Sequence, residues 1–160
     1  MQILKRYVLP AAFVATLLAI DQFTKWLAVT YLQPIREFVL IEGVFSLFYH
    51  ENQGMAFGLF QGGRWFFVVA TVVALGFFIY FYVKMPKTRY HNTIRFFLLI
   101  FMGGALGNFT DRLFNDGFVV DFLFFNLINF PIFNMADVFL VVAVFAIMII
   151  LLFVKEPKNE

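Results

Sequence analysis

Two aspartates stand where a very hydrophobic chain would not be expected to carry carboxylates. Asp121 lies in the apolar run Gly-Phe-Val-Val-Asp-Phe-Leu-Phe-Phe, and Asp137 follows Asn134-Met-Ala. Ionisable groups in such surroundings are costly, so they are functional candidates by default. Two carboxylates can perform acid-base hydrolysis, because one accepts a proton from water while the other, protonated, polarises the scissile carbonyl. We therefore interpret Asp121 and Asp137 as a candidate catalytic pair.

The two aspartates have different surroundings. Asn134 stands three residues before Asp137 and shortly after Pro131, which predicts a helix start with Asn134 as the N-cap and Asp137 in the first turn. The helix dipole favours the ionised form of Asp137, whereas the Val and Phe residues around Asp121 should oppose its ionisation. Because two close carboxylates share one proton, their titration belongs to the pair.

Other nucleophiles are few in this chain. There is no Cys, and Ser46 is the only serine, which leaves one possible Ser-Lys pair, Ser46 with Lys25. His50 and His91 fall on opposite sides of the membrane in the topology predicted below, and the sequence after His50 lacks the second histidine of a zinc protease helix. We therefore expect no metal site, and aspartyl chemistry remains the leading interpretation.

Asp21 and Lys25 are four residues apart on the first predicted helix, so their side chains can pair. One interpretation is an ion pair that neutralises itself in the membrane. The other is a supporting role beside Asp121 and Asp137. The sequence leaves both open.

A run of small and polar residues lies in the third predicted helix. Gly103 and Gly107 share one face, and small residues at that spacing predict close helix packing in lipid. A neighbouring face continues as a polar line at three- and four-residue steps: Gly104, Asn108, Asp111 and Arg112. A structural salt link from Arg112 to Asp111 or Asp116 is the alternative to direct chemistry.

Composition identifies the class of protein. Hydrophobic residues make up 62% of the chain and charged residues 14%, and the mean hydropathy is +0.87, which excludes an ordinary soluble protein. We expect one membrane-embedded domain over residues 1–160. Crossing a hydrocarbon core takes roughly 20 helical residues. We predict four transmembrane helices, at 8–30, 65–83, 94–109 and 138–154. The third is short for a span, but Arg95 can extend to the membrane surface at one end and the helix can continue through Asn108 at the other.

The placement of charge predicts the orientation, because short cytoplasmic loops collect Lys and Arg. Most of the 12 basic residues lie near the termini or around the connection between the second and third spans. Both termini are therefore predicted to be cytoplasmic. The connections 31–64 and 110–137 then face outward, and both candidate aspartates lie near the extracytoplasmic face.

The connection 31–64 is long and apolar. Two β-prone runs, 38–41 and 44–49, surround a Glu-Gly turn and predict a small β-sheet at the outer membrane surface. This sheet could be a simple cap over the helix ends or a cradle that binds an extended peptide by strand addition. Five glycines make a mobile lid a further hypothesis: Gly43, Gly54, Gly58, Gly62 and Gly63. The predicted fold class is thus an all-α integral membrane protein with four transmembrane helices and a small extracytoplasmic β-sheet.

Two other function classes fit the same residues. A small proton-coupled transporter or channel would also place carboxylates in or beside its spans. Against it stand the small number of spans, the lack of an internal repeat and the grouping of carboxylates at one face. A scaffold or assembly protein with structural polar residues would tolerate Asp-to-Asn changes.

Five blocks of sequence together resemble the bacterial lipoprotein signal peptidase family, signal peptidase II. The blocks begin at Asp21, Asn52, Gly103, Val119 and Phe133 and read Asp-Gln-Phe-Thr-Lys-Trp, Asn-Gln-Gly-Met-Ala-Phe-Gly, Gly-Gly-Ala-Leu-Gly-Asn-Phe-Thr-Asp-Arg, Val-Val-Asp-Phe and Phe-Asn-Met-Ala-Asp. The match runs in order through essentially the whole chain. Each block is weak alone, but five in register are specific.

The resemblance implies an aspartic endopeptidase of the bacterial cytoplasmic (inner) membrane. Such an enzyme removes signal peptides from prolipoproteins just before a diacylglyceryl-modified cysteine, with no metal or organic cofactor. It implies Asp121 and Asp137 as the catalytic dyad and Asp21 and Lys25 as supporting residues. The other motif positions are implied to line the site: Asn52, Gly54, Gly104, Asn108, Asp111, Arg112, Asn134 and Ala136. The expected partners are lipidated prolipoproteins and membrane lipids, without nucleic acid, and we expect a monomer.

Overall fold

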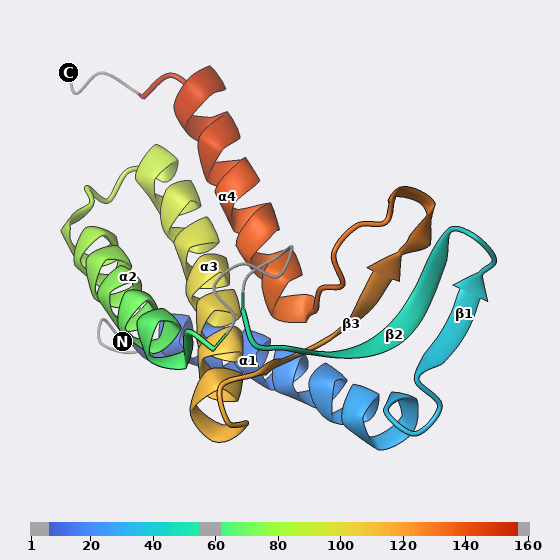
Figure 1. Ribbon diagram of the computed structural model, residues 1–160. Helices are drawn as coiled ribbons and strands as arrows, with labels where there is room; N and C mark the ends of the chain where they lie inside the picture. The colour runs from blue at the N-terminus through green and yellow to red at the C-terminus, as the bar shows by residue number, and fades with distance from the viewer. Residues whose placement is uncertain (1–6, 55–61, 157–160) are drawn as a thin grey trace.

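Four apolar helices dominate the computed structural model, which describes residues 7–54 and 62–156 (Figure 1). All four are long and apolar enough to cross a membrane, as predicted. They are α1 (Leu9–Leu27, continued by the π-helical turn η2, Ala28–Leu32), α2 (Arg64–Lys84), α3 (Arg89–Phe114) and α4 (Met135–Phe153).

The third helix is longer than the predicted span 94–109. It begins after Thr88, whose side chain accepts a hydrogen bond from the backbone N–H of His91, and it ends at Phe114. Hydropathy identifies only the apolar part of a helix, and the two ends of α3 carry polar residues, so the prediction was too short.

Helix α3 packs against α1, α2 and α4, and its glycines permit the close approach. A Cβ atom on Gly103 would lie 2.7 Å from Cβ of Leu17 on α1, and one on Gly107 would lie 3.0 Å from Cβ of Ala136 on α4. The predicted packing role of Gly103 and Gly107 is therefore confirmed.

A three-stranded antiparallel sheet stands beside the start of α4 (Figure 1). Its strands are β1 (Glu37–Ile41), β2 (Phe45–Asn52) and β3 (Val119–Phe125), in the order β1-β2-β3. The predicted hairpin of β1 and β2 is confirmed, and its turn contains Gly43 at a φ of 68°.

Strand β3 was not predicted, and its residues lie in the connection 110–137, for which we predicted no strand. Its first four residues are all buried, so the sequence shows no alternation of apolar and polar positions that would mark a strand. One end of the sheet packs on the end of α1 through a small core: Ala28, Leu32, Tyr49, Val120 and Phe122.

Candidate active site

The two candidate catalytic residues come from different elements. Asp121 lies in the middle of β3 and is 1% exposed. Asp137 lies in the first turn of α4, where it completes a capping box with Asn134: the Asn134 side chain accepts from the Asp137 N–H, and the Asp137 carboxylate accepts from the Asn134 N–H. The predicted helix start at Asn134 is therefore confirmed.

Both carboxylate oxygens of Asp121 accept hydrogen bonds from amide side chains. Asn52 Nδ2 donates to Oδ2 at 3.0 Å, and Asn134 Nδ2 donates to Oδ1 at 2.6 Å. Burial, followed by the nearby negative charge of Asp137, raises the pKa of Asp121 from 3.8 to about 7, although these hydrogen bonds and Lys25 act in the opposite direction. The expectation that Asp121 would resist ionisation is confirmed.

Both carboxylate oxygens of Asp137 also accept hydrogen bonds. Asn108 Nδ2 donates to Oδ1 at 2.7 Å, and the backbone N–H of Asn134 donates to Oδ2 at 3.1 Å. Asn134 Nδ2 also donates to Asn108 Oδ1 at 3.1 Å. Asn108 and Asn134 therefore connect the two aspartates through one hydrogen-bond network.

A β-bulge brings Asn52 to the same face of the sheet as Asp121. Leu47 pairs with Leu123, but further along β2 the register shifts, so that His50 pairs with Asp121 and Asn52 with Val119. Paired residues share a face, and a one-residue shift exchanges the faces. Without the bulge, Asn52 would point away from Asp121.

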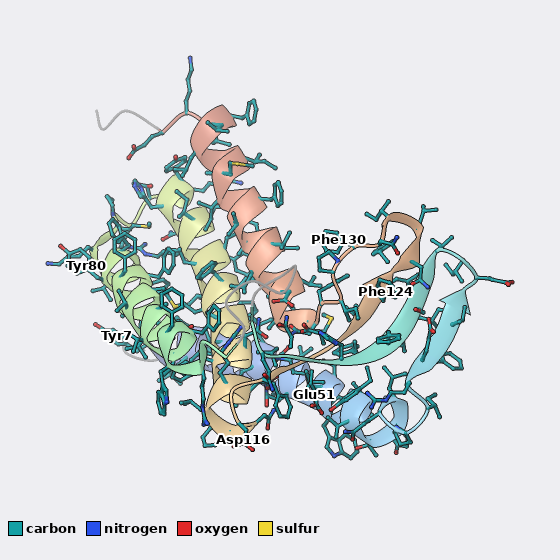
Figure 2. The ribbon with its side chains drawn as sticks, viewed as in Figure 1. Tyr7, Glu51, Tyr80, Asp116, Phe124 and Phe130 are labelled. Atoms are coloured by element: carbon teal, nitrogen blue, oxygen red, sulfur yellow. The ribbon has the colours of Figure 1, made fainter. Side chains whose placement is uncertain are left out.

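A cavity of about 600 Å³ opens at the two aspartates. Its polar members are Asn52, Asp121 and Asp137, and the rest of its wall is almost entirely apolar. Phe130, on the connection from β3 to α4 (Figure 2), lies in this wall. The remaining lining residues are Gly54, Phe125, Ile128, Pro131, Ile132, Phe133, Val138, Val141 and Val142. The arrangement suits an apolar ligand with one polar group at the carboxylates.

A second group of charges lies beneath the dyad. Lys25 Nζ is 2.9 Å from Asp21 Oδ2 and 3.0 Å from Asp111 Oδ2, and all three side chains are at most 3% exposed. The predicted pairing of Asp21 with Lys25 is therefore confirmed. Lys25 also donates to Asn108 Oδ1 at 3.1 Å, which joins this group to the dyad network.

The alternative of a salt link from Arg112 to Asp111 or Asp116 is not found among the described residues, where Asp111 pairs with Lys25. The Arg112 guanidinium instead donates to the backbone carbonyls of Asn108 and Gly54, both at 3.3 Å, and lies 4.6 Å from the ring centre of Phe67. Arg112 therefore fixes the backbone turn that follows Asn52.

Some residues expected to line the site lie behind it. Gly104 packs against α4, and Ala136 is completely buried. Asn134, Asn108, Asp111 and Arg112 act through hydrogen bonds to the site or its backbone and are absent from the cavity wall. Of the eight motif positions expected to line the site, Asn52 and Gly54 do so. Residues 55–58 of the second motif lie outside the described residues, and they include Gly58 of the hypothetical lid.

The alternative serine chemistry has no support in the fold. Ser46 is completely buried in β2 and donates to Asn126 Oδ1, whereas Lys25 is held by Asp21, Asp111 and Asn108. Within residues 7–54 and 62–156, no three His, Cys, Asp or Glu side chains gather in a way that could hold a metal ion.

Sequence reasoning missed Gln22. Its Nε2 donates to Asp111 Oδ1 at 2.8 Å, to Asp21 Oδ2 at 3.2 Å and to the Gly107 carbonyl at 3.3 Å. The only signal was its place directly after Asp21, since a glutamine carries no charge to mark it in an apolar helix.

Three kinds of comparison agree on what this chain is similar to. The family model described as Signal peptidase (SPase) II matches residues 13–153. A lipoprotein signal peptidase of Brevibacillus brevis is 41% identical over 146 residues, which cover 91% of this chain and 95% of that protein. Another, from Caldanaerobacter subterraneus, is 45% identical over 130 residues, 81% of this chain and 86% of that protein. A solved structure described as a bacterial membrane enzyme superposes with a TM-score of 0.82 at 31% identity, covering 96% of each chain.

Proposed function

The chain belongs to the signal peptidase II family of aspartic membrane peptidases, and on that premise we propose that it removes signal peptides from prolipoproteins by means of the Asp121–Asp137 dyad. The observation that supports a catalytic role for this pair is its geometry. Asp121 and Asp137 are the two carboxylates in the wall of the apolar cavity, and the hydrogen-bond network of Asn108 and Asn134 joins them.

Water is the attacking group in this mechanism. The dyad is proposed to hold one proton, and the burial of Asp121, which raises its pKa, favours the protonated form of this residue. The ionised Asp137 accepts a proton from water as the water oxygen attacks the scissile carbonyl carbon, while protonated Asp121 donates a hydrogen bond to the carbonyl oxygen. The tetrahedral intermediate then collapses, the C–N bond breaks, and a proton passes from the dyad to the leaving amine.

The apolar wall supports a lipidated substrate. Val138, Val141 and Val142 continue along α4 away from Asp137, so a chain lying against them would run along a membrane-spanning helix. A diacylglyceryl group on the cysteine after the scissile bond fits this position, because its acyl chains would stay in an apolar environment while the peptide meets the dyad. Cleavage is therefore proposed to fall just before the modified cysteine.

The remaining parts of the proposal concern orientation and partners. We place both termini in the cytoplasm and the dyad near the extracytoplasmic face of a bacterial inner membrane, on the charge distribution alone. We expect residues 1–160 to act as one monomeric domain whose partners are lipidated prolipoproteins and membrane lipids, with no nucleic acid and no cofactor. The residues that support the dyad are Asp21, Lys25, Asn52, Gly54, Gly104, Asn108, Asp111, Arg112, Asn134 and Ala136.

The deciding experiment is cleavage of a purified diacylglyceryl-modified prolipoprotein by the wild type, Asp121→Asn and Asp137→Asn, each confirmed folded in detergent. Both variants should lose several orders of magnitude in kcat, as expected for members of one catalytic unit. Addition of a chelator should leave the wild-type rate unchanged.

Each other outcome contradicts a definite part of the proposal. A variant that cleaves near the wild-type rate would remove its aspartate from the catalytic mechanism. A folded wild type that is inert on the authentic lipidated substrate would contradict the peptidase function itself and favour a transporter that uses the same carboxylates.

A further inference from the structure

Two buried carboxylates, Asp21 and Asp111, accept hydrogen bonds from the backbone directly before each member of the dyad. Asp21 Oδ1 accepts the backbone N–H of Ala136 at 2.8 Å, and Ala136 immediately precedes Asp137. Asp111 Oδ2 accepts the backbone N–H of Val120 at 3.1 Å, and Val120 immediately precedes Asp121. Each catalytic aspartate is therefore preceded by a residue whose N–H is bound to a buried carboxylate.

The two carboxylates are held to one another. Lys25 Nζ contacts Asp21 Oδ2 at 2.9 Å and Asp111 Oδ2 at 3.0 Å, and Gln22 Nε2 donates to both side chains. Lys25 and Gln22 lie on α1, Asp111 lies on α3, and the held N–H groups lie on α4 and β3. This group thus connects the elements that supply the two halves of the dyad.

We propose that Asp21, Gln22, Lys25 and Asp111 form a brace that sets the separation of the two catalytic carboxylates by holding the backbone before each one. The inference rests on the proposed function, because it assumes that Asp121 and Asp137 react together. Lys25 and its partners are positioning residues, since they do not line the cavity.

Energetics favour a positioning role over a purely stabilising one. Removing two carboxylates and a lysine from water is costly, and well-packed apolar residues often stabilise a protein as well as a buried ion cluster does. The cluster supplies directional hydrogen bonds that apolar packing cannot supply. A displacement of about 1 Å in a catalytic group can cost about a hundredfold in rate, so the brace acts where precision matters.

A matched pair of variants at Asp21 separates hydrogen bonding from packing. Asparagine and leucine side chains have the same branching and the same number of non-hydrogen atoms, but only the asparagine offers an oxygen to the Ala136 N–H. We expect Asp21→Leu to lower kcat about a hundredfold with KM changed less than about threefold, and Asp21→Asn to recover at least about tenfold of that loss. The measurement is steady-state cleavage of the diacylglyceryl-modified prolipoprotein, normalised to folded protein by thermal unfolding in detergent.

A second pair of variants tests the brace by steric crowding, without changing any charge. A Cβ atom on Gly107 would collide with Asp21 Oδ2 and lie 2.8 Å from its Cγ and 3.0 Å from Cβ of Ala136. The three atoms nearest to a Cβ atom on Gly103 all belong to the Leu17 side chain, the first at 2.7 Å. Gly107→Ala should therefore lower kcat at least about tenfold with little change in KM. Gly103→Ala, the control for crowding α3 against α1, should lower kcat less than Gly107→Ala does, because the atoms that it meets belong to Leu17 and not to the brace.

The outcomes are distinguishable from those of the dyad test. If the wild type fails to cleave, the proposed function fails, whatever the brace does. If the wild type cleaves but Asp21→Leu and Asp21→Asn lose kcat equally, or Gly107→Ala matches Gly103→Ala, the brace does not position the dyad. Losses in the folded fraction alone, with normal kcat in the remaining protein, would reduce the cluster to a structural role and overturn the inference.

Discussion

At the residue scale, a single asparagine, Asn134, forms hydrogen bonds to both Asp121 and Asp137. Asn134 is completely buried, its Oδ1 accepts the Asp137 N–H, and its Nδ2 donates to Asp121 Oδ1 and Asn108 Oδ1. These roles require one amide orientation, with the oxygen towards the start of α4 and the nitrogen towards β3. The side chain that starts the helix therefore also orients the carboxylate on the strand.

The buried carboxyl of Asp121 should make stability depend on pH. Its pKa is raised from 3.8 to about 7, so the folded protein keeps a proton that the unfolded chain has lost between these values. The free energy of unfolding then falls as pH rises through that window. Asp121→Asn removes this titration, so the unfolding temperature of the variant minus that of the wild type should increase from about pH 5 to about pH 8.

Thermal unfolding in detergent across this pH range measures the difference. Asp116→Asn is the control, since Asp116 is exposed on the turn after α3 and its φ of 48° is one that asparagine tolerates. A temperature difference for Asp121→Asn that does not vary with pH would contradict the raised pKa.

Asn52 should tune the pH profile of cleavage. Its hydrogen bond to Asp121 Oδ2 favours the charged carboxylate and so lowers the pKa of Asp121. Asn52→Leu removes this bond while keeping the branching of the side chain, so the pKa of Asp121 should rise above about 7. The alkaline limb of the kcat/KM profile, on which Asp121 loses its proton, should move to higher pH. An unchanged profile in a folded variant would show that Asp121 does not control this limb.

At the scale of elements, helix contact distance decides whether the polar network can form. Gly104 brings the backbones of α3 and α4 together, since a Cβ there would lie 2.5 Å from the Ala136 carbonyl oxygen. One turn further along α3, Asn108 reaches Asp137 across the same contact at 2.7 Å. The close packing of two helices is thus a condition of the hydrogen bond to the Asp137 carboxylate.

Gly104→Ala should therefore separate α3 from α4. We expect a loss of about 1–3 kcal/mol in the free energy of unfolding, the usual cost of overpacking, together with reduced cleavage. Gly76→Ala on α2 is the matched control, because a Cβ there meets nothing within 4 Å. The control should be as stable as the wild type or more so, since alanine is the better helix former. Equal stabilities of the two variants, measured by thermal unfolding, would contradict the packing argument.

At the scale of the whole molecule, the dyad forms because distant parts of the chain meet at one end of the bundle. Strand β3 joins the β1–β2 hairpin to make the sheet, and the connection after β3 returns to α4 beside it (Figure 1). Both connections that were predicted to face outward therefore contribute to the same cavity wall, with Asn52 from one and Asp121 from the other.

The orientation in the membrane can be tested with single cysteines, because the chain has no cysteine of its own. Glu42 lies exposed in the turn between β1 and β2, and Lys87 lies exposed between α2 and α3. In cells whose outer envelope is permeabilised but whose inner membrane is intact, a membrane-impermeant maleimide should label Glu42→Cys. It should label Lys87→Cys only after the inner membrane is permeabilised as well. Labelling in the reverse order would invert the proposed topology and place the dyad at the cytoplasmic face.

The sequence by itself determined the class of protein, the four helices, the β1–β2 hairpin and the identity of the two candidate aspartates. These features depend on local signals: long apolar runs, a Glu-Gly turn, an N-cap three residues before Asp137, and carboxylates in apolar surroundings. Each can be recognised from a few neighbouring residues, because helix length, turn chemistry and desolvation cost depend on near neighbours.

Only the tertiary structure decided how these residues meet. Strand β3 carries no alternating pattern because its first half is buried on both faces, and the bulge in β2 that turns Asn52 towards Asp121 depends on pairing with β3. The sequence allowed Asp111 to pair with Arg112, but in the fold Asp111 binds Lys25 and the Val120 N–H. The partners of Asp111 lie on α1 and β3, so no local spacing rule could choose among them, and the choice required the packed positions of three elements.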